Sequence, residues 1–259
     1  MRGTVEHGSE THVLIFPLPA QGNVNPLLQL AELLALSNVH VTFLNTHHIH
    51  GRLLHFTADI EARYPTLRFE TFADSVPDDN PRFGGDMDEF FNHVKLNSAL
   101  KLRELCLGQP RKPRITCIIR DGIFRDITSD IGDDLSIPVI HFRTTSACCF
   151  WSYFSVPKLL QSNEIHIRGE EDMDRIIAKI PGMENLIRFQ DLPSSFRGDR
   201  NGYIPLETLV FQTNQTLRAQ ALILNTFEDL EGPVLSQIRL HFPKLYNLGP
   251  LHTHDTTQL

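Results

Sequence analysis

The sequence predicts an α/β protein built on a Rossmann-like, doubly wound parallel sheet. Short apolar segments alternate along the chain with segments whose leucines recur at helical spacing. The first apolar segment, His12 to Phe16 (HVLIF), is continuous rather than alternating, which is typical of a strand buried on both faces. Strands that alternate with helices form βαβ units, so we expect about seven parallel strands with helices on both faces of the sheet.

Each expected strand is a short apolar run, and most are rich in β-branched residues. The run from Leu67 to Phe72 alternates with polar residues, which predicts an edge strand. In chain order the expected strands are His12 to Phe16, Val39 to Leu44, Leu67 to Phe72, Ile115 to Ile119, Ile137 to Phe142, Ala221 to Asn225 and Leu245 to Leu248.

The expected helices fall between these strands. Asn25 is the expected N-cap of the first helix, because Pro26 behind it suits a first turn. Thr144 is an N-cap candidate for a later helix, whose aromatic residues we expect in the core. After the helix that follows Pro26, the helices are Asp86 to Leu105, one beginning at Ile123 to Ile131, Thr144 to Leu160, Leu206 to Ala219 and Phe227 to Leu240.

A long polar connection separates two of these helices. Residues Gln161 to Arg200 are punctuated by proline and glycine and show no helical or strand periodicity. Connections of this length are often lids or binding loops. A poorly ordered surface insertion is the other interpretation, and the sequence leaves both open.

Charge and cysteine usage exclude several classes of partner. The chain of 259 residues has a formal net charge of -7, which argues against a nucleic-acid partner because phosphate binding needs clustered lysine and arginine. Its four cysteines lack metal-ligand spacing and predict small buried groups in a reducing compartment. We expect a cytoplasmic protein, since neither a signal peptide nor a membrane span is evident. His47, His48 and His50 are interpreted as part of a solvated loop, not a metal site.

Polar residues gather where the first and fourth strands end. A doubly wound sheet binds ligands beyond the carboxyl ends of its strands. The loop from Pro17 to Pro26 and the residues after Ile119 both lie at that edge. Gly22, Asn23 and Asp121 are therefore expected neighbours in a ligand-binding domain, although this pattern does not specify the ligand.

Several segments then indicate a family. FPLPAQGNVNPLLQLAELL, from Phe16 to Leu34, resembles the opening of plant family-1 UDP-glycosyltransferases, where the pattern is P-x-P-x-Q-G-H-x-N-P before a leucine-rich helix. The segments TCIIRDGIF, IPVIHFRTTSA, IPGMENLIRFQDLPSSF and ALILNTFEDLEGPVL with LYNLGPL agree with the family in order and spacing. The stretch VTFLNTHHIHGRLL suggests the subgroup that glucosylates iridoids and similar terpenoids.

The resemblance implies the N-terminal half of a two-domain GT-B architecture. Residues 1–251 would form the acceptor-binding domain, and residues 252–259 would begin the interdomain linker. The family's donor motifs, W-x-P-Q and H-C-G-W-N-S, do not occur, so the C-terminal donor domain is expected to be absent from this chain, as a fragment or a natural truncation. The implied reaction is an inverting transfer of a sugar, with glucose expected, from a UDP-sugar to a small hydrophobic plant metabolite. The UDP-sugar is a co-substrate, and no cofactor or metal is implied.

The family also implies which residues act. Its histidine after Q-G takes the acceptor proton as general base, and an aspartate orients that imidazole. Asp121 in RDGIF matches the aspartate, whereas Asn23 in QGNVNP stands in place of the histidine. Gly22 and Thr144 match positions near the donor sugar. The positions that line the acceptor site are matched by Ile123 and Phe196.

Asn23 puts the activity of this chain in question, because an amide does not accept a proton at neutral pH. A positioned general base is worth roughly 10²–10⁴-fold in rate. Three routes stay open: an acceptor that is already a nucleophile, such as a carboxylate or an amine; Asp121 as a direct base; or loss of transferase activity. The rival function is a non-catalytic module that binds a small molecule or docks on a partner. A nucleotide-dependent oxidoreductase is disfavoured because PLPAQGN lacks G-x-G-x-x-G.

Overall fold

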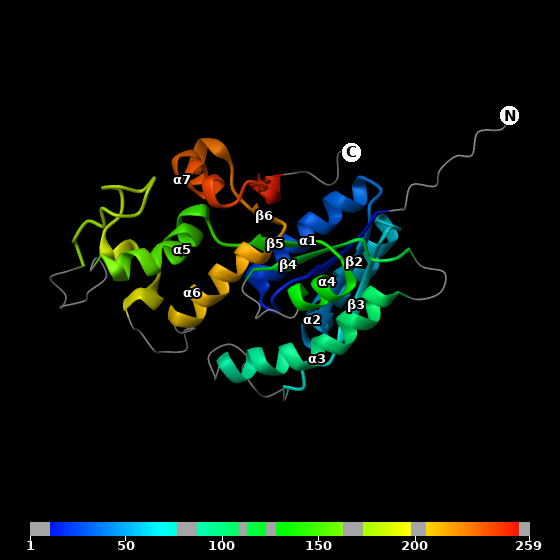
Figure 1. Ribbon diagram of the computed structural model, residues 1–259. Coiled ribbons are helices and arrows are strands. Elements are labelled where there is room, and N and C mark those ends of the chain that lie inside the picture. The colour runs from blue at the N-terminus through cyan, green and yellow to red at the C-terminus, as the bar shows by residue number, and fades with distance from the viewer. Residues whose placement is uncertain are drawn as a thin grey trace.

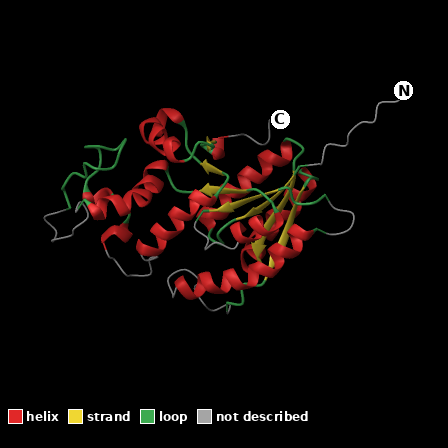
Figure 2. Ribbon diagram, viewed as in Figure 1, coloured by secondary structure: helices red, strands yellow, loops and turns green. Residues whose placement is uncertain are grey.

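The computed structural model describes residues 11–76, 87–108, 113–122, 128–162, 173–197 and 206–253. Their strands form one seven-stranded parallel sheet in the order β3-β2-β1-β4-β5-β6-β7, with helices packed around it (Figures 1 and 2). This confirms the predicted fold class and the edge position of β3. The strands are β1 (His12–Phe16), β2 (His40–Thr46), β3 (Leu67–Phe72), β4 (Cys117–Asp121), β5 (Val139–Arg143), β6 (Ala221–Leu224) and β7 (Leu245–Asn247).

Strand β1 lies inside the sheet and contributes to the core on both faces. Val13 and Ile15 pack in one cluster, against the first helix, whereas Leu14 and Phe16 pack in another cluster on the opposite face. Every residue of β1 is buried. The continuous apolar pattern HVLIF is thus explained by two-sided burial, as predicted.

Seven α-helices occur in the described residues. Helices α1 and α2 pack on one face of β1 and β2, and α3 and α4 pack on the other. Helices α5, α6 and α7 form a further core cluster with β6, at the left of Figure 1. The helices are α1 (Gln21–Leu36), α2 (His47–Arg63), α3 (Met87–Leu107), α4 (Thr128–Leu135), α5 (Ala147–Gln161), α6 (Leu206–Asn214) and α7 (Glu228–His241).

Helix α1 begins before the predicted N-cap Asn25, so that prediction was wrong. The backbone N–H groups of Asn23 and Val24 both donate to the Ala20 carbonyl, at 2.9 Å, and these bonds start the helix at Gln21. Pro26 therefore lies inside the helix rather than in its first turn. Because proline has no N–H, the usual helical hydrogen bond to the Gly22 carbonyl cannot form.

The histidines assigned to a solvated loop lie instead in the first turn of α2. The Thr46 side chain caps this helix by accepting a hydrogen bond from the Ile49 backbone N–H at 3.2 Å. Ile49 is buried against the sheet cluster, which holds the turn in place. The sequence pattern was misleading because few residues of α2 are buried, so its apolar periodicity is weak.

Helix α5 is capped at Ser146, and the prediction of Thr144 as its N-cap was wrong. The Ser146 hydroxyl accepts from the Cys149 N–H at 3.1 Å. The Glu231 carboxylate on α7 accepts from the N–H groups of Ala147 and Cys148 at 2.9 and 2.8 Å. With these donors satisfied by other groups, the Thr144 side chain is not needed at the helix end.

The described part of the long connection belongs to the core. Ile177, Ile180 and Phe189 are fully buried among residues of α5 and α7. The indole N–H of Trp151 donates to the Pro181 carbonyl at 2.8 Å, and Ile176 forms an antiparallel bridge with Arg188. Residues 173–197 are thus a packed segment, not a surface insertion.

We expect Phe189→Ala to lower the free energy of unfolding by about 3–5 kcal/mol, because it leaves a cavity in this cluster. Leu186→Ala is the matched control in the same segment. Its side chain is 74% exposed, so the change should stay within about 0.5 kcal/mol. Urea unfolding monitored by circular dichroism measures both. Equal effects of the two substitutions would contradict the packing described here.

Candidate active site

Three side chains that are far apart in sequence meet at the carboxyl edge of the sheet. Asn23 lies in the first turn of α1, Asp121 ends β4, and Thr144 follows β5 directly. The Asn23 side-chain N–H₂ donates to Asp121 Oδ2 at 2.7 Å and to Thr144 Oγ1 at 2.9 Å. They meet because β1, β4 and β5 are adjacent and parallel, so their following residues emerge at one edge.

The glycine that precedes Asn23 is exposed and uncrowded. Gly22 lies within α1, and a Cβ atom built on it would find no atom within 4 Å. Neither a tight turn nor close packing therefore requires glycine at this position. The open space beside Gly22 adjoins Asn23.

The two predicted acceptor-lining residues differ in outcome. Ile123 lies outside the described residues. Phe196 is buried in the core, with its ring centroid 5.4 Å from that of Tyr153, whose hydroxyl lies 2.9 Å from Ser195 Oγ. Phe196 is thus held by core packing.

A buried guanidinium, which the sequence analysis did not single out, lies beneath the site. Arg143 donates to the Gly122 carbonyl at 2.9 Å, and its guanidinium carbon lies 5.3 Å from the centre of the Phe150 ring. Burial lowers the pKa of Arg143, and the opposing charge of Asp121 partly offsets this effect. Gly122 is required here, because a Cβ would lie 2.4 Å from Arg143 Cδ. The sequence signal was a charged residue closing an apolar strand, as in IHFR.

A second buried contact, between Arg120 and His141, lies two residues earlier on β4 and β5. Arg120 Nε donates to His141 Nε2 at 2.8 Å, and both side chains are fully buried. The pKa of His141 is well below its ordinary value of 6.5, first because burial disfavours the cation and then because Arg120, Arg143 and Arg218 repel it. Accepting this hydrogen bond requires a neutral imidazole.

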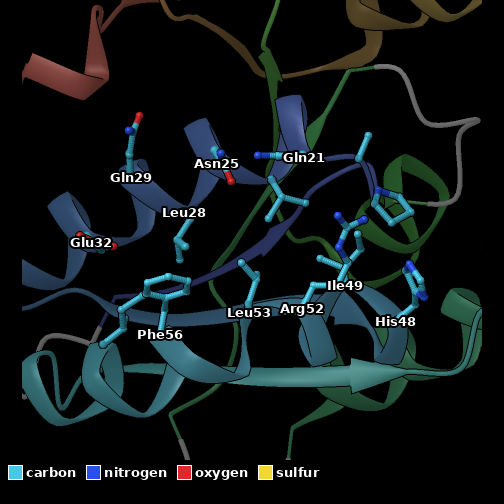
Figure 3. A pocket seen from close by; sticks show the side chains of 14 residues that line it. Gln21, Asn25, Leu28, Gln29, Glu32, His48, Ile49, Arg52, Leu53 and Phe56 are labelled. Atoms are coloured by element: carbon cyan, nitrogen blue, oxygen red, sulfur yellow. The ribbon is translucent and has the colours of Figure 1, made fainter. Parts of the chain in front are cut away.

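A groove of about 850 Å³ runs between α1 and α2, beside the active-site edge. Figure 3 shows Leu28 of α1 facing Leu53 and Phe56 of α2 across it. Polar side chains of α1, including Gln21 and Gln29, also line the groove. Asn23, Asp121 and Thr144 do not line it, so the hydrogen-bonded set and the groove are neighbours rather than one site.

Sequence comparison agrees with the family indicated by the motifs, although no family model matches the chain. A 7-deoxyloganetic acid glucosyltransferase from Catharanthus roseus is 44% identical over 264 residues, which cover 99% of this chain and 54% of the relative. UDP-glycosyltransferase 85A5 from Arabidopsis thaliana is 34% identical over 96% of this chain and 52% of its own length. The chain is a relative of the plant UDP-glycosyltransferases. It spans about half the length of the curated relatives it matches, and the iridoid subgroup is consistent with these similarities.

Solved structures show the same fold. LpCGTa in complex with UDP has a TM-score of 0.71 at 24% identity, over 93% of this chain and 52% of that one. UDP-glucose: anthocyanidin 3-O-glucosyltransferase, also solved with UDP, has a TM-score of 0.68 at 21% identity, over 93% of this chain and 53% of that one. The chain therefore has the fold of about half of each of these two structures, in agreement with the expected GT-B architecture.

Two features are absent from the part of the chain that the structure describes. No helix there combines the length and the apolarity needed to cross a bilayer. In the same residues, no group of three or more histidine, cysteine, aspartate or glutamate side chains is arranged to hold a metal ion. His47, His48 and His50 are thus not part of such a group.

We expect the stability of this UDP-glycosyltransferase relative to fall as the pH drops below 6.5, in part through His141. The unfolded chain binds a proton on this imidazole near its ordinary pKa, whereas the folded chain does not. The free energy of unfolding should therefore fall by up to about 1.4 kcal/mol per pH unit from this residue. Urea unfolding at a series of pH values measures the slope. His141→Gln should flatten it, and an identical slope in both proteins would contradict this assignment.

Proposed function

We propose that the chain is the acceptor-binding half of a UDP-dependent glycosyltransferase that acts on a small hydrophobic metabolite. The observation that carries this proposal is the hydrogen-bonded set of Asn23, Asp121 and Thr144, at the positions where the family resemblance expects the base, its aspartate and a sugar contact. The relatives in sequence are glucosyltransferases or UDP-glycosyltransferases by name, and solved structures of the same fold contain UDP.

The proposal assigns a role to each site residue. Gly22 and Thr144 contact the donor sugar, which the open space beside Gly22 would accommodate. The family resemblance alone assigns Ile123 and Phe196 to the acceptor side, because Phe196 packs in the core and Ile123 lies outside the described residues. Residues 1–251 form the acceptor domain, residues 252–259 begin the linker, and the UDP-sugar binds only when a C-terminal donor domain is supplied. A cytoplasmic location, expected from the cysteine pattern, is part of the same proposal.

The chemistry of such a transfer requires a recipient for the acceptor proton. In the inverting displacement, the acceptor oxygen attacks the anomeric carbon while the bond to UDP breaks. A neighbouring base normally removes the hydroxyl proton as this happens. Asn23 offers an amide in that place, so we expect transfer to ordinary hydroxyl groups to be strongly impaired.

The same substitution favours the second candidate, a non-catalytic module that binds a small molecule or docks on a partner. Such a module keeps the fold and the binding edge of the sheet and has no need of a base. The two candidate functions differ in their response to a restored base. A histidine at position 23 should restore turnover in an impaired glycosyltransferase, whereas it should restore none in a non-catalytic module.

We expect residues 1–259 alone to bind UDP-glucose no more tightly than about 1 mM, because the family resemblance places the donor contacts outside these residues. Isothermal titration calorimetry on the purified chain measures this. UMP under the same conditions controls for weak nonspecific binding of the nucleotide. Micromolar affinity for UDP-glucose would show that the two-half assignment is wrong.

We expect Asn23→His to raise hydroxyl glucosylation by roughly 10²-fold or more when a donor domain from a close relative is fused after Leu251. The geometry supports this, because Asp121 already accepts a hydrogen bond from the side chain at position 23. Initial rates with a phenolic acceptor measure the gain, and adding Asp121→Ala should remove most of it. If the fusion is active and Asn23→His leaves its rate unchanged, position 23 is not the base position. If neither the fusion nor its Asn23→His variant transfers any sugar, the non-catalytic module is favoured.

A further inference from the structure

The side chain of Asn23 uses its entire donor capacity inside the protein. A carboxamide nitrogen carries two N–H donors. One is directed to Asp121 Oδ2 at 2.7 Å and the other to Thr144 Oγ1 at 2.9 Å. A ligand that approaches Asn23 therefore finds no donor left on this side chain.

Asp121 determines which end of the amide faces inward. A carboxylate only accepts hydrogen bonds, so the amide nitrogen and not the amide oxygen must face it. Thr144 imposes no such choice, because a hydroxyl can donate or accept. Asp121 is fully buried and ends a strand inside the sheet, so its carboxylate is held firmly in this position.

The atom left for a ligand is the Asn23 carbonyl oxygen. It has no hydrogen-bond partner among the described residues, and it is not one of the buried unpartnered atoms. Asn23 itself is partly exposed, and the neighbouring Gly22 borders open space. The site thus presents a fixed hydrogen-bond acceptor to its ligand.

A fixed acceptor discriminates among ligand head groups. A carboxylate also offers only acceptors, and it would face both the Asn23 oxygen and the negative charge of Asp121 behind it. A hydroxyl can donate to Asn23 but keeps its proton, so it binds without being activated. A neutral amine donates one N–H while the lone pair of its nitrogen stays available for attack.

We propose that Asp121 fixes the polarity of Asn23 so that the site takes neutral N–H nucleophiles, above all aromatic amines, and rejects carboxylates. This inference rests on the proposed function. In the transfer, the amine lone pair forms the bond to the anomeric carbon of the UDP-sugar, and the bond from that carbon to the diphosphate oxygen breaks with its electron pair leaving on UDP. The proton then leaves the new ammonium for water, so no base is needed before attack.

The test uses three ligands with one skeleton, 4-isopropylaniline, 4-isopropylphenol and 4-isopropylbenzoate, at neutral pH. The readout is the side-chain amide resonance of Asn23 in ¹⁵N-labelled chain, assigned by its loss in Asn23→Leu. We expect saturable shifts with the amine and the phenol, and an affinity for the benzoate that is about tenfold weaker, the upper end of the usual worth of one hydrogen bond.

Asp121→Asn tests whether the orientation of the Asn23 amide, rather than the fold of the site, sets the ligand preference. This nearly isosteric change lets the Asn23 amide turn round, because the carboxamide introduced at position 121 and the Thr144 hydroxyl can each donate or accept. We expect the preference for the amine over the benzoate to shrink to within about threefold, while the circular dichroism spectrum is unchanged. Thr144→Val keeps Asp121 and should keep the preference.

The outcomes are distinguishable. If the benzoate binds the unmodified chain as well as the amine does, the polarity inference is overturned while an acceptor site remains. Retention of the full preference in Asp121→Asn would also overturn it. If none of the three ligands shifts the resonance, the chain has no acceptor site at this edge, and the proposed function fails together with the inference.

Discussion

The parallel adjacency of β1, β4 and β5 is the constraint on which the site depends. Their register pairs Phe16 with Arg120 and Asp121 with Phe142, so the residues that follow these strands emerge side by side. Burial on both faces holds β1 in this position, because its alternate residues pack in two separate clusters. The hydrogen bonds of Asn23 join the first turn of α1 to the residues at the ends of β4 and β5.

Two arginine side chains are buried next to this edge of the sheet. Arg120 and Arg143 are both fully buried, and burying an uncompensated cation is costly. Arg120 donates to His141, and Arg143 is held by the Gly122 carbonyl, the Phe150 ring and the charge of Asp121. Asp121 is therefore linked both to Asn23, through a hydrogen bond, and to the charge of Arg143. A substitution at Asp121 changes both.

Helix capping explains how Thr144 becomes available to the site. The N-terminal N–H groups of α5 are satisfied by Ser146 and by Glu231 from α7. Thr144, two residues ahead of the cap, can therefore accept from Asn23. Helix α7 thus affects the site indirectly, because its Glu231 caps α5 and leaves the Thr144 side chain available to Asn23.

The sequence alone determined the fold class, the number of strands, their places along the chain and the edge position of β3, because burial on one or two faces leaves a direct pattern in apolar residues. It also placed Asn23 and Asp121 together, since parallel strands end at one edge. It did not predict α2, where few side chains are buried and the pattern is weak, or the start of α1, which backbone bonds to Ala20 decide. Only the tertiary structure showed that residues 173–197 belong to the core and that Glu231 caps α5. It alone showed which way the Asn23 amide points, because these features depend on contacts between residues far apart in the chain, and no local pattern records them.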